Sequence, residues 1–329
     1  PVQSEQGVLG AIVGASNNDF EESKNILMNF CKDVFHFGDV GIGAKTKLIS
    51  NFLSLGTATF VIETLKAAKH HNIDMQKLID VARLAGCDFV KFQKRTPDIC
   101  VPEHQKNKMR STPWGDMKYI DYKKKIEFEK QEYDEIDEYC SKAGVQWFAS
   151  VWDTESVKFL TQYSSIVKIP SALITNDELV IAARKNFKTL IISTGMSTEN
   201  EIEHAVKIGK PDVIMHTNSS YPSDVNELNL NYILHLKNKY SNIDIGYSGH
   251  EYGLYTTVAT VPMGAKWIER HITLDRRMWG SDHSSSVEPN GLFKLVMAVR
   301  NVEKAMGPGG PRKLYRSELE KRKSLRGDR

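Results

Sequence analysis

The chain has 329 residues, of which 26% are charged and 40% hydrophobic, and these are ordinary values for a globular protein. A formal net charge of +3 is too small to indicate nucleic-acid binding, and no apolar run approaches the ~20 residues that a membrane span needs. The four cysteines have no C-x-x-C spacing, which indicates reduced thiols. We therefore expect a cytoplasmic protein with no nucleic-acid partner and no membrane partner.

Residues 1–79 carry two glycines followed by a lysine and an asparagine. Gly41 and Gly43 precede Lys47 and Asn51, which lie one helical turn apart on the same face of an expected helix. Together with the run EQGVLGAIVGASNNDFEESKNIL, this pattern resembles the C-terminal helical domain of β-hydroxyacid dehydrogenases of the 3-hydroxyisobutyrate type. The resemblance implies a mostly helical partial domain over residues 1–79, with Lys47 and Asn51 as its catalytic remnant.

A nicotinamide enzyme also needs a phosphate-binding turn between a strand and a helix. The chain contains no G-x-G-x-x-G, and the GIGAKT that begins at Gly41 lacks the third glycine. We therefore expect no NAD to bind. The join to the rest of the chain lies in a predicted helix around residues 74–85 with no visible linker, so a natural fusion and an artificial junction both fit the sequence.

From residue 80 onward, short β-branched runs alternate with helical patterns, which predicts βαβ units and a parallel sheet. Seven such strands over roughly 240 residues fit a (β/α)8 TIM-type barrel better than an open sheet. A polar segment with three prolines, residues 96–122, is expected to form an extended loop over the barrel mouth. The expected strands are 88–91, 145–150, 166–169, 189–193, 212–216, 244–247 and 266–271, and the clearest helices are 126–142, 177–185 and 291–306.

Polar residues follow or end each of these strands, at the face where barrel enzymes hold their substrates. Lys91 and Lys168 lie within the apolar motifs VKFQ and VKIP, and a lysine buried in this way suits a phosphate or a carboxylate. Hydroxyl groups would complete such an anion site. The candidate hydroxyls belong to Ser150, Ser171, Ser193 and Ser248.

Two histidines, His250 and His271, follow successive strands of the predicted barrel. Because the carboxyl ends of parallel barrel strands open onto one face, the two imidazoles can converge on one metal ion. Imidazole suits a divalent transition ion, with carboxylate or water completing its coordination.

These motifs together resemble the sialic acid synthase (NeuB) family over about three quarters of the chain. The matching segments are KFQKRTPD from Lys91, KIPSA from Lys168, ISTGMST from Ile192, HTNSSYP from His216, GYSGHE from Gly246, ERHITLD from Glu269 and GSDH from Gly280. Members of this family condense phosphoenolpyruvate with an N-acylated amino-sugar aldehyde and release phosphate, on a TIM barrel with Mn²⁺ or Mg²⁺.

The resemblance implies a role for each matching residue. His250 and His271 would hold the metal, and Lys91 and Lys168 would be catalytic and hold phosphoenolpyruvate with the four serines named above. Gln93, Ser219, Tyr221 and Asp282 would complete the substrate site, with Tyr221 and Asp282 facing the sugar. The partners would be phosphoenolpyruvate, an amino sugar and, as an assembly to consider, a second copy in a homodimer.

The chain departs from the family pattern in three places. The family's first strand, which reads like IAEIG and is followed by N-H-N-G, is not found before Lys91, so we expect a barrel over residues 80–329 that lacks its usual first strand. Ala172 and Leu173 stand where an acid often orients the sugar, and no C-terminal antifreeze-like domain is expected.

Two alternatives to an N-acetylneuraminate synthase-like enzyme remain at the level of sequence. One is a fragment of an NAD-dependent 3-hydroxyacid dehydrogenase, which would need a dinucleotide domain. The other is a catalytically inactive fusion of two partial proteins, which would follow if the lack of the first strand abolished substrate binding.

Overall fold

The computed structural model describes residues 9–29, 31–36, 38–40, 75–280 and 282–327. The chain divides into two compact units, Pro1–Asp74 and Met75–Arg329, and each is described by itself. The helix that spans the expected boundary at residue 79, α4 (Met75–Ala85), belongs to the second unit, where its buried Ile79 and Ala82 join the main core. In the described part of the chain no helix is long and apolar enough to cross a membrane.

The described residues of the first unit include two strands, whereas a mostly helical segment was expected over residues 1–79. Its described residues form strand β1 (Leu9–Val13), helix α2 (Asn17–Leu27) and strand β2 (Cys31–His36), with the two strands parallel. The apolar run LGAIV favours a strand, and Ser16 then starts the helix because its side chain accepts a hydrogen bond from the backbone of Asp19. Lys47 and Asn51 lie outside the described residues, so the dehydrogenase resemblance stays a prediction.

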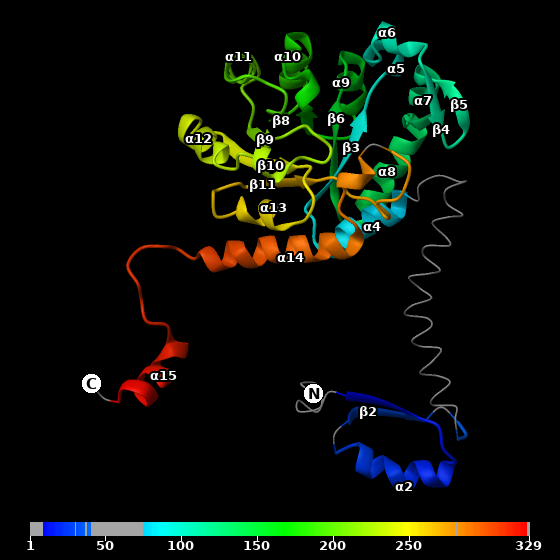
Figure 1. The fold of residues 1–329 in the computed structure, drawn as a ribbon, viewed down its shortest axis with the longest axis vertical. Helices are drawn as coiled ribbons and strands as arrows, with labels where there is room; N and C mark the ends of the chain where they lie inside the picture. The colour runs from blue at the N-terminus through cyan, green and yellow to red at the C-terminus, as the bar shows by residue number, and fades with distance from the viewer. Residues whose placement is uncertain (1–8, 30, 37, 41–74, 281, 328–329) are drawn as a thin grey trace. The chain divides into compact units, whose positions relative to one another are not determined.

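The second unit is built on a parallel sheet curled into a barrel-like layer, with helices on its outer face (Figure 1). Its seven strands, ordered β11-β10-β9-β8-β7-β6-β3, confirm the α/β TIM-type architecture. Each strand pairs with its neighbour in parallel, so all carboxyl ends lie on one face. The strands are β3 (Phe89–Lys94), β6 (Gln146–Val151), β7 (Ile166–Ile169), β8 (Thr189–Ser193), β9 (Val213–Thr217), β10 (Asp244–Gly249) and β11 (Trp267–Arg270).

Strands β3 and β11 are the two edges of this sheet, as expected for a barrel without its first strand. Side chains nevertheless connect the two edges. The rings of Phe89 and Trp267 stack with their centres 5.6 Å apart, and Lys91 Nζ lies 2.7 Å from Glu269 Oε1. The sheet is therefore curved enough to bring its first and last strands within reach of each other.

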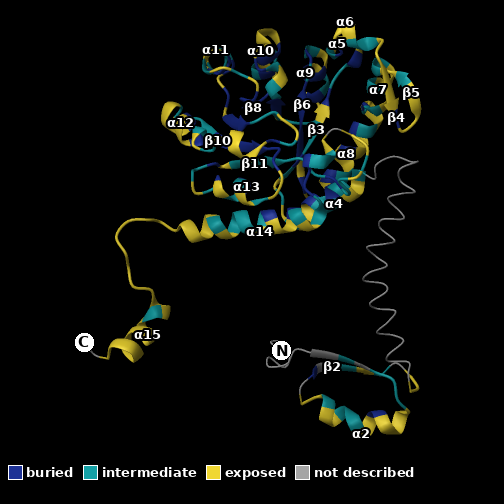
Figure 2. Cartoon of the chain, viewed as in Figure 1, coloured by how far each residue is buried: buried dark blue, intermediate teal, exposed yellow. Residues whose placement is uncertain are grey.

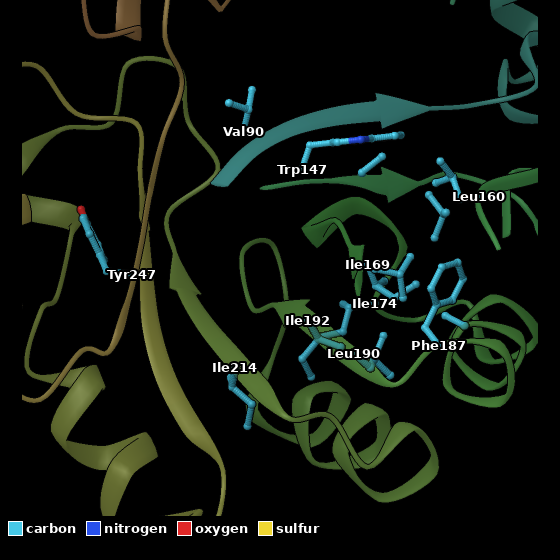
Figure 3. Packing of buried hydrophobic residues seen from close by; sticks show 14 of the residues in the cluster. Val90, Trp147, Leu160, Ile169, Ile174, Phe187, Leu190, Ile192, Ile214 and Tyr247 are labelled. Atoms are coloured by element: carbon cyan, nitrogen blue, oxygen red, sulfur yellow. The ribbon is translucent and has the colours of Figure 1, made fainter. Parts of the chain in front are cut away.

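The main core lies between the outer face of the sheet and the helices. Figure 2 shows the buried strands inside a layer of helices whose outer faces are exposed. Ile169, Leu190 and Ile192 from neighbouring strands pack with Phe187, as Figure 3 shows. Burial of such side chains contributes roughly 1.5–3 kcal/mol each, so this layer is the chief stabilising element of the unit.

Most expected helices form, with small shifts at their ends. The helix expected at 126–142 begins later, at Lys130, because Glu129 and Glu132 form a capping box there. The helices of the barrel layer are α8 (Lys130–Ala143), α9 (Thr154–Leu160), α10 (Asp177–Asn186), α11 (Glu199–Gly209), α12 (Tyr232–Lys239), α13 (Tyr255–Ala259) and α14 (Pro289–Met306). Short 3-10 turns are Ser171–Leu173, Val225–Glu227 and His283–Ser285, and an exposed helix, α15 (Arg316–Arg326), follows α14.

The segment expected to be an extended loop, residues 96–122, is in fact structured. It contains α5 (Pro97–Cys100), α6 (Glu103–Lys106) and a hairpin of β4 (Met109–Thr112) with β5 (Gly115–Lys118), and α7 (Tyr119–Ile126) follows. Pro97 and Pro102 stand at the starts of α5 and α6, where a missing backbone N–H costs little. The prolines that suggested a loop therefore begin short helices.

Candidate active site

The inner face of the sheet has an apolar floor beneath a polar layer. Side chains alternate between the two faces of a strand, so residues two apart point the same way. Phe89, Phe148, Ile166, Ile191 and Trp267 belong to one inner hydrophobic cluster. Two residues further along the same strands lie Lys91, Ser150, Lys168, Ser193 and Glu269. The polar layer therefore lies at the carboxyl ends of the strands, where barrel enzymes hold their substrates.

Glu269 is the centre of this layer. Its Oε1 atom accepts hydrogen bonds from Lys91 Nζ at 2.7 Å, Lys168 Nζ at 2.6 Å and Ser248 Oγ at 3.1 Å. The Lys168 side chain is only 4% exposed and that of Glu269 15% exposed. One carboxylate thus gathers two cations from β3 and β7.

Burial and the neighbouring charges shift the pKa values of Lys168 and Glu269. Burial lowers the pKa of Lys168 to about 8. The negative charge of Glu269 opposes this shift, and the positive charge of Lys91 adds to it. The pKa of Glu269 lies well below its usual value, because the attraction of Lys168 and Lys91 outweighs the desolvation that would raise it. Two cations and one anion leave an excess of positive charge, which suits an anionic ligand.

Two buried hydroxyls border the same layer without a partner. Ser150 Oγ on β6 and Ser193 Oγ on β8 have no hydrogen-bond partner among the residues that the structure describes. An unsatisfied buried polar group is costly, and unpaired groups gather at sites that bind ligands or water. The two hydroxyls are therefore available to a ligand that accepts hydrogen bonds.

The turn after β8 brings residues from three strand ends together. The backbone N–H of Gly195 donates to Ser171 Oγ at 3.1 Å. A Cβ atom at Gly195 would lie 2.1 Å from Ser219 Oγ and 2.8 Å from Ser171 Oγ. Only glycine allows these two serines to approach as closely as they do.

We expect Gly195→Ala to lower turnover by about 10- to 100-fold, because displacing site groups by about 1 Å can cost that much. Steady-state kinetics on the folded variant would measure this. Gly209→Ala is the matched control, since its Cβ would meet Val180 Cγ1 at 2.7 Å within the helical layer. Similar losses of kcat/KM in both variants would mean that Gly195 acts only through stability.

The two histidines lie next to each other at the ends of β10 and β11. Their ring centres are 5.2 Å apart, and the ring of Tyr221 lies 4.2 Å from that of His250. His250 Nδ1 is 2.7 Å from the carbonyl oxygen of Asn218, which can only accept, so Nδ1 donates and Nε2 is left without the proton. Asn218 therefore fixes the His250 tautomer.

Both imidazoles are held in the neutral form that metal ligation requires. Burial lowers the pKa of His250, and burial together with Lys91 and His250 lowers the pKa of His271 to about 4. Neutral imidazoles are good ligands for divalent ions. Among the described residues no group of three or more His, Cys, Asp and Glu side chains forms a complete metal cluster.

The remaining predicted residues lie around the mouth. Gln93 is an exposed residue of β3 whose backbone oxygen accepts a hydrogen bond from Tyr133. Tyr221 is 42% exposed beside the histidines. Asp282 lies in the segment before the 3-10 turn His283–Ser285, and its charge acts against the pKa depression of His271.

Sequence reasoning missed Glu269 and Asn218 as site residues. Both stand inside motifs that were noticed, ERHITLD and HTNSSYP. Glu269 could have been found by strand alternation, because it lies two residues before His271 and so faces the same side. Asn218 acts through its backbone oxygen, for which its side-chain type gives no signal.

Comparison with known proteins decides the family. Residues 78–310 match the model of the NeuB family. The chain belongs to the NeuB family. A relative, the N,N'-diacetyllegionaminic acid synthase of Campylobacter jejuni, is 34% identical over 257 residues, which cover 74% of this chain and 77% of the relative.

Other NeuB-family relatives support the same placement. The human N-acetylneuraminate-9-phosphate synthase is 33% identical over 75% of this chain and 71% of its own length. The crystal structure of the N-acetylneuraminic acid synthetase from Leptospira borgpetersenii, in complex with citrate, superposes with a TM-score of 0.66 at 33% identity and covers 76% of this chain and 86% of that chain. These relatives are synthases of nonulosonic acids, and the resemblance found in the sequence is confirmed.

Proposed function

We propose that the protein is a nonulosonic acid synthase that condenses phosphoenolpyruvate with an N-acyl-mannosamine-type sugar aldehyde and releases phosphate. The observation that carries the proposal is the pair Lys91 and Lys168, which share the carboxylate of Glu269. Beside them lie the hydroxyls of Ser150 and Ser193, which have no hydrogen-bond partner among the residues that the structure describes. This combination suits a small ligand that bears both a phosphate and a carboxylate.

Phosphoenolpyruvate would bind in the polar layer. Lys91 and Lys168 would hold its two anionic groups, and Ser150, Ser193 and Ser248 would donate hydrogen bonds to its oxygens. Ser171, whose Oγ accepts a hydrogen bond from the backbone N–H of Gly195, would complete the set of hydroxyl groups around the ligand. Glu269 keeps the lysines charged and oriented before the ligand arrives, so that little reorganisation is needed when negative charge develops.

The sugar would bind further out, against Tyr221, Asp282, Gln93 and Ser219. The exposed ring of Tyr221 gives an apolar surface for a sugar face, and Asp282 provides an acceptor for hydroxyl groups. With phosphoenolpyruvate in the polar layer and the sugar further out, the sugar aldehyde would lie above the methylene carbon of phosphoenolpyruvate.

His250 and His271 would hold a divalent ion such as Mn²⁺ or Mg²⁺, whose chemistry is to polarise a carbonyl as a Lewis acid. The chain's own contribution is the neutral state of both rings and the fixed tautomer of His250. The lowered pKa values of the two rings keep them neutral, and the hydrogen bond to the Asn218 carbonyl fixes the tautomer of His250.

In the reaction a carbon–carbon bond forms between the methylene carbon and the aldehyde carbon, and the aldehyde oxygen becomes a hydroxyl. Water adds to the carbon that bears the phosphate, and the bond from that carbon to the phosphate oxygen breaks. The two lysines stabilise the negative charge that leaves with phosphate.

The direct test measures phosphate release from phosphoenolpyruvate with N-acetylmannosamine and Mn²⁺, run beside His250→Ala. We expect release that requires the sugar and the metal and that falls by at least about 10- to 100-fold in the variant, because loss of a mere second-shell partner of a metal ligand already costs that much. Folded protein that releases no phosphate with any amino sugar would favour the inactive-fusion alternative.

The pKa of Lys168 predicts a pH dependence of ligand affinity. Because this pKa is lowered to about 8, the ammonium is charged below that pH and neutral above it. We therefore expect the dissociation constant for phosphoenolpyruvate, measured by calorimetry, to rise as the pH increases from 7 to 9.5. Lys168→Arg keeps a charge at these pH values, so it should remove the rise. A constant affinity across this range in the unaltered protein would contradict the prediction.

A further inference from the structure

The paired part of the sheet ends just before the two histidines. The ladder between β10 and β11 stops where Gly249 lies opposite Arg270. His250 and His271 are the next residues along the two strands. Backbone pairing of the strands therefore stops one residue short of the two rings, and other contacts must set the distance between them.

The neighbouring segments hold each histidine separately. The backbone oxygen of His250 accepts a hydrogen bond from the N–H of Ser223 at 3.1 Å, and that of His271 accepts one from the N–H of Val287 at 2.7 Å. Ser223 follows β9, whereas Val287 lies just before α14. These two bonds fix each strand exit, but they do not join one exit to the other.

Arg270 does join the two exits. Its side chain points to the outer face of the sheet, because side chains alternate along a strand and its neighbours Glu269 and His271 face inward. From β11 its Nη2 donates to the backbone oxygen of Glu251 at 2.6 Å, and its Nη1 donates to the backbone oxygen of Gly253 at 2.9 Å. One planar guanidinium thus continues the link between the strands beyond the last ladder pair.

The carboxylate of Glu251 holds this guanidinium in place. Its Oε1 accepts a hydrogen bond from Arg270 Nη1 at 3.3 Å, and the side chains of Arg270 and Glu251 are 2% and 0% exposed. Thr256 and Thr257 of α13 donate to the same oxygen at 2.8 Å and 2.7 Å. The link between the two exits is therefore buried and anchored on a helix.

The arrangement leaves one donor of Arg270 unsatisfied. Its Nε is buried and has no hydrogen-bond partner among the residues that the structure describes. Such donors are costly and rare in folded proteins. The network also packs directly against Gly249, where a Cβ atom would lie 2.6 Å from Glu251 Oε2. The guanidinium is thus oriented by the carbonyl oxygens that it bridges, at the expense of its own Nε.

We propose that Arg270 is a positioning residue that sets the distance between His250 and His271, and with it the affinity of these two rings for a divalent ion. The inference rests on the proposed function, and it adds a residue that acts on the metal site from the outer face of the sheet. A residue behind metal ligands typically changes metal affinity by about 10- to 100-fold.

The test measures the affinity for Mn²⁺ in the full chain and in Arg270→Lys, by a titration in which electron paramagnetic resonance reports free Mn²⁺. We expect the dissociation constant to rise by about 10-fold, the lower end of the range for residues behind metal ligands. Lysine keeps a positive charge but has no planar fork with which to bridge two carbonyl oxygens. A lysine that lost its proton would repel Mn²⁺ less, so a change of charge would shift the affinity in the opposite direction.

Thr257→Val is a milder second variant. The Thr257 hydroxyl accepts a hydrogen bond from Arg270 Nη1 at 2.8 Å while it donates to Glu251. Valine has nearly the same shape and leaves both charges in place. We expect the Mn²⁺ dissociation constant to rise by about 3-fold, because a single neutral hydroxyl contributes less than a charged group.

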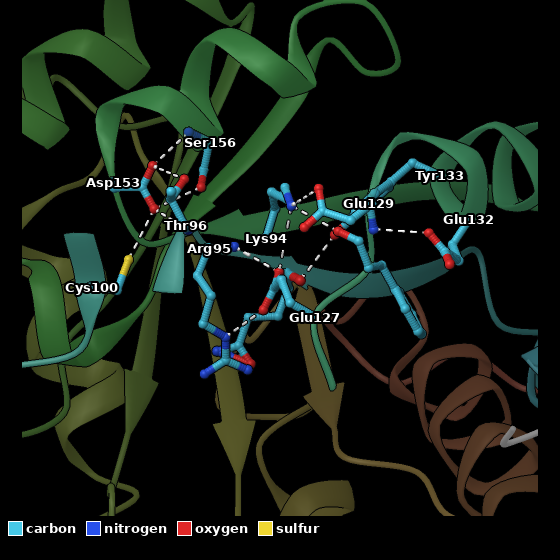
Figure 4. Close-up of polar contacts among 12 residues, drawn as sticks. Lys94, Arg95, Thr96, Cys100, Glu127, Glu129, Glu132, Tyr133, Asp153 and Ser156 are labelled. Atoms are coloured by element: carbon cyan, nitrogen blue, oxygen red, sulfur yellow. Dashed lines mark hydrogen bonds and ion pairs between the residues drawn. The ribbon is translucent and has the colours of Figure 1, made fainter. Parts of the chain in front are cut away.

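Arg95→Lys is the matched control. Arg95 is also a largely buried arginine at a strand exit, and its backbone N–H and Nε donate to the carboxylate of Glu127 at 2.9 Å and 2.8 Å, as Figure 4 shows. It follows β3 and not β10 or β11. We expect a comparable loss of thermal stability but a Mn²⁺ dissociation constant within about twofold of the unaltered chain, because sites without shared partners act independently.

The outcomes separate positioning from stability and from the reaction. An unchanged Mn²⁺ affinity in Arg270→Lys, or an equal loss in Arg95→Lys, would overturn the inference and leave the phosphate-release test of the proposed function as it stands. Mn²⁺ binding that is the same in His250→Ala as in the unaltered chain would instead remove the metal site on which both rest. Weaker binding in folded Arg270→Lys and Thr257→Val, with an unaffected control, would support the inference.

Discussion

Lys168→Met is expected to lower kcat/KM for phosphoenolpyruvate by about 100- to 1,000-fold. Lys168 is a buried cation bound to Glu269, and truncating one member of a buried charged pair costs about 2–5 kcal/mol. Methionine has a similar length, so the change removes the charge and leaves the packing largely intact. Saturation kinetics with phosphoenolpyruvate as the varied substrate would measure the effect.

The same substitution at Lys266 is the control for Lys168. Lys266 pairs with Asp244 at the amino-terminal ends of β11 and β10, on the far side of the sheet from the polar layer. The Lys266 side chain is 69% exposed. Lys266→Met should leave kcat/KM within about twofold, because exposed ion pairs contribute little. A Lys168→Met enzyme with nearly full activity would remove the phosphoenolpyruvate site from the polar layer.

Glu251→Ala is expected to destabilise the barrel unit by about 3–5 kcal/mol. Glu251 and Arg270 form an ion pair whose side chains are 0% and 2% exposed. The carboxylate also accepts hydrogen bonds from Tyr247, Thr256 and Thr257. Removing it would leave a buried guanidinium without its counter-ion, and denaturant unfolding at constant pH would measure the loss.

A surface pair provides the comparison for this stability effect. Arg277 pairs with Asp275, and 72% of the Arg277 side chain is exposed. Arg277→Met should cost less than about 1 kcal/mol. If Glu251→Ala proved as mild as Arg277→Met, the Glu251–Arg270 pair would not be the support for the ends of β10 and β11 that its burial indicates.

The barrel could be predicted from the sequence because each strand was a short β-branched run that ended in polar residues. Strands Ile166–Ile169 and Thr189–Ser193 were predicted with their exact ends. The segment after β3 was predicted as a loop, because its prolines were taken to interrupt secondary structure. In the structure, Pro97 and Pro102 instead stand at the starts of the short helices α5 and α6. In the N-terminal unit the run Leu9–Val13 was assigned to a helical domain by resemblance, but its pairing with Cys31–His36 makes it a strand.

The candidate site was predictable in its parts and not in its connections. Lysines and histidines at strand ends are visible in the sequence, and the barrel topology implies that they face one mouth. Glu269 on β11 pairs with both Lys91 on β3 and Lys168 on β7. These pairs form only because the curvature of the sheet brings the three strands close together, and the sequence does not reveal that curvature.

The central claim is the formation of a carbon–carbon bond between phosphoenolpyruvate and an amino sugar, and the most direct measurement is mass spectrometry of the product made from uniformly ¹³C-labelled phosphoenolpyruvate. With an amino sugar and Mn²⁺, the account predicts a keto acid that contains the sugar plus three labelled carbons and lacks the phosphate of phosphoenolpyruvate. Labelled carbon that remains in phosphoenolpyruvate or appears only as pyruvate would contradict the account.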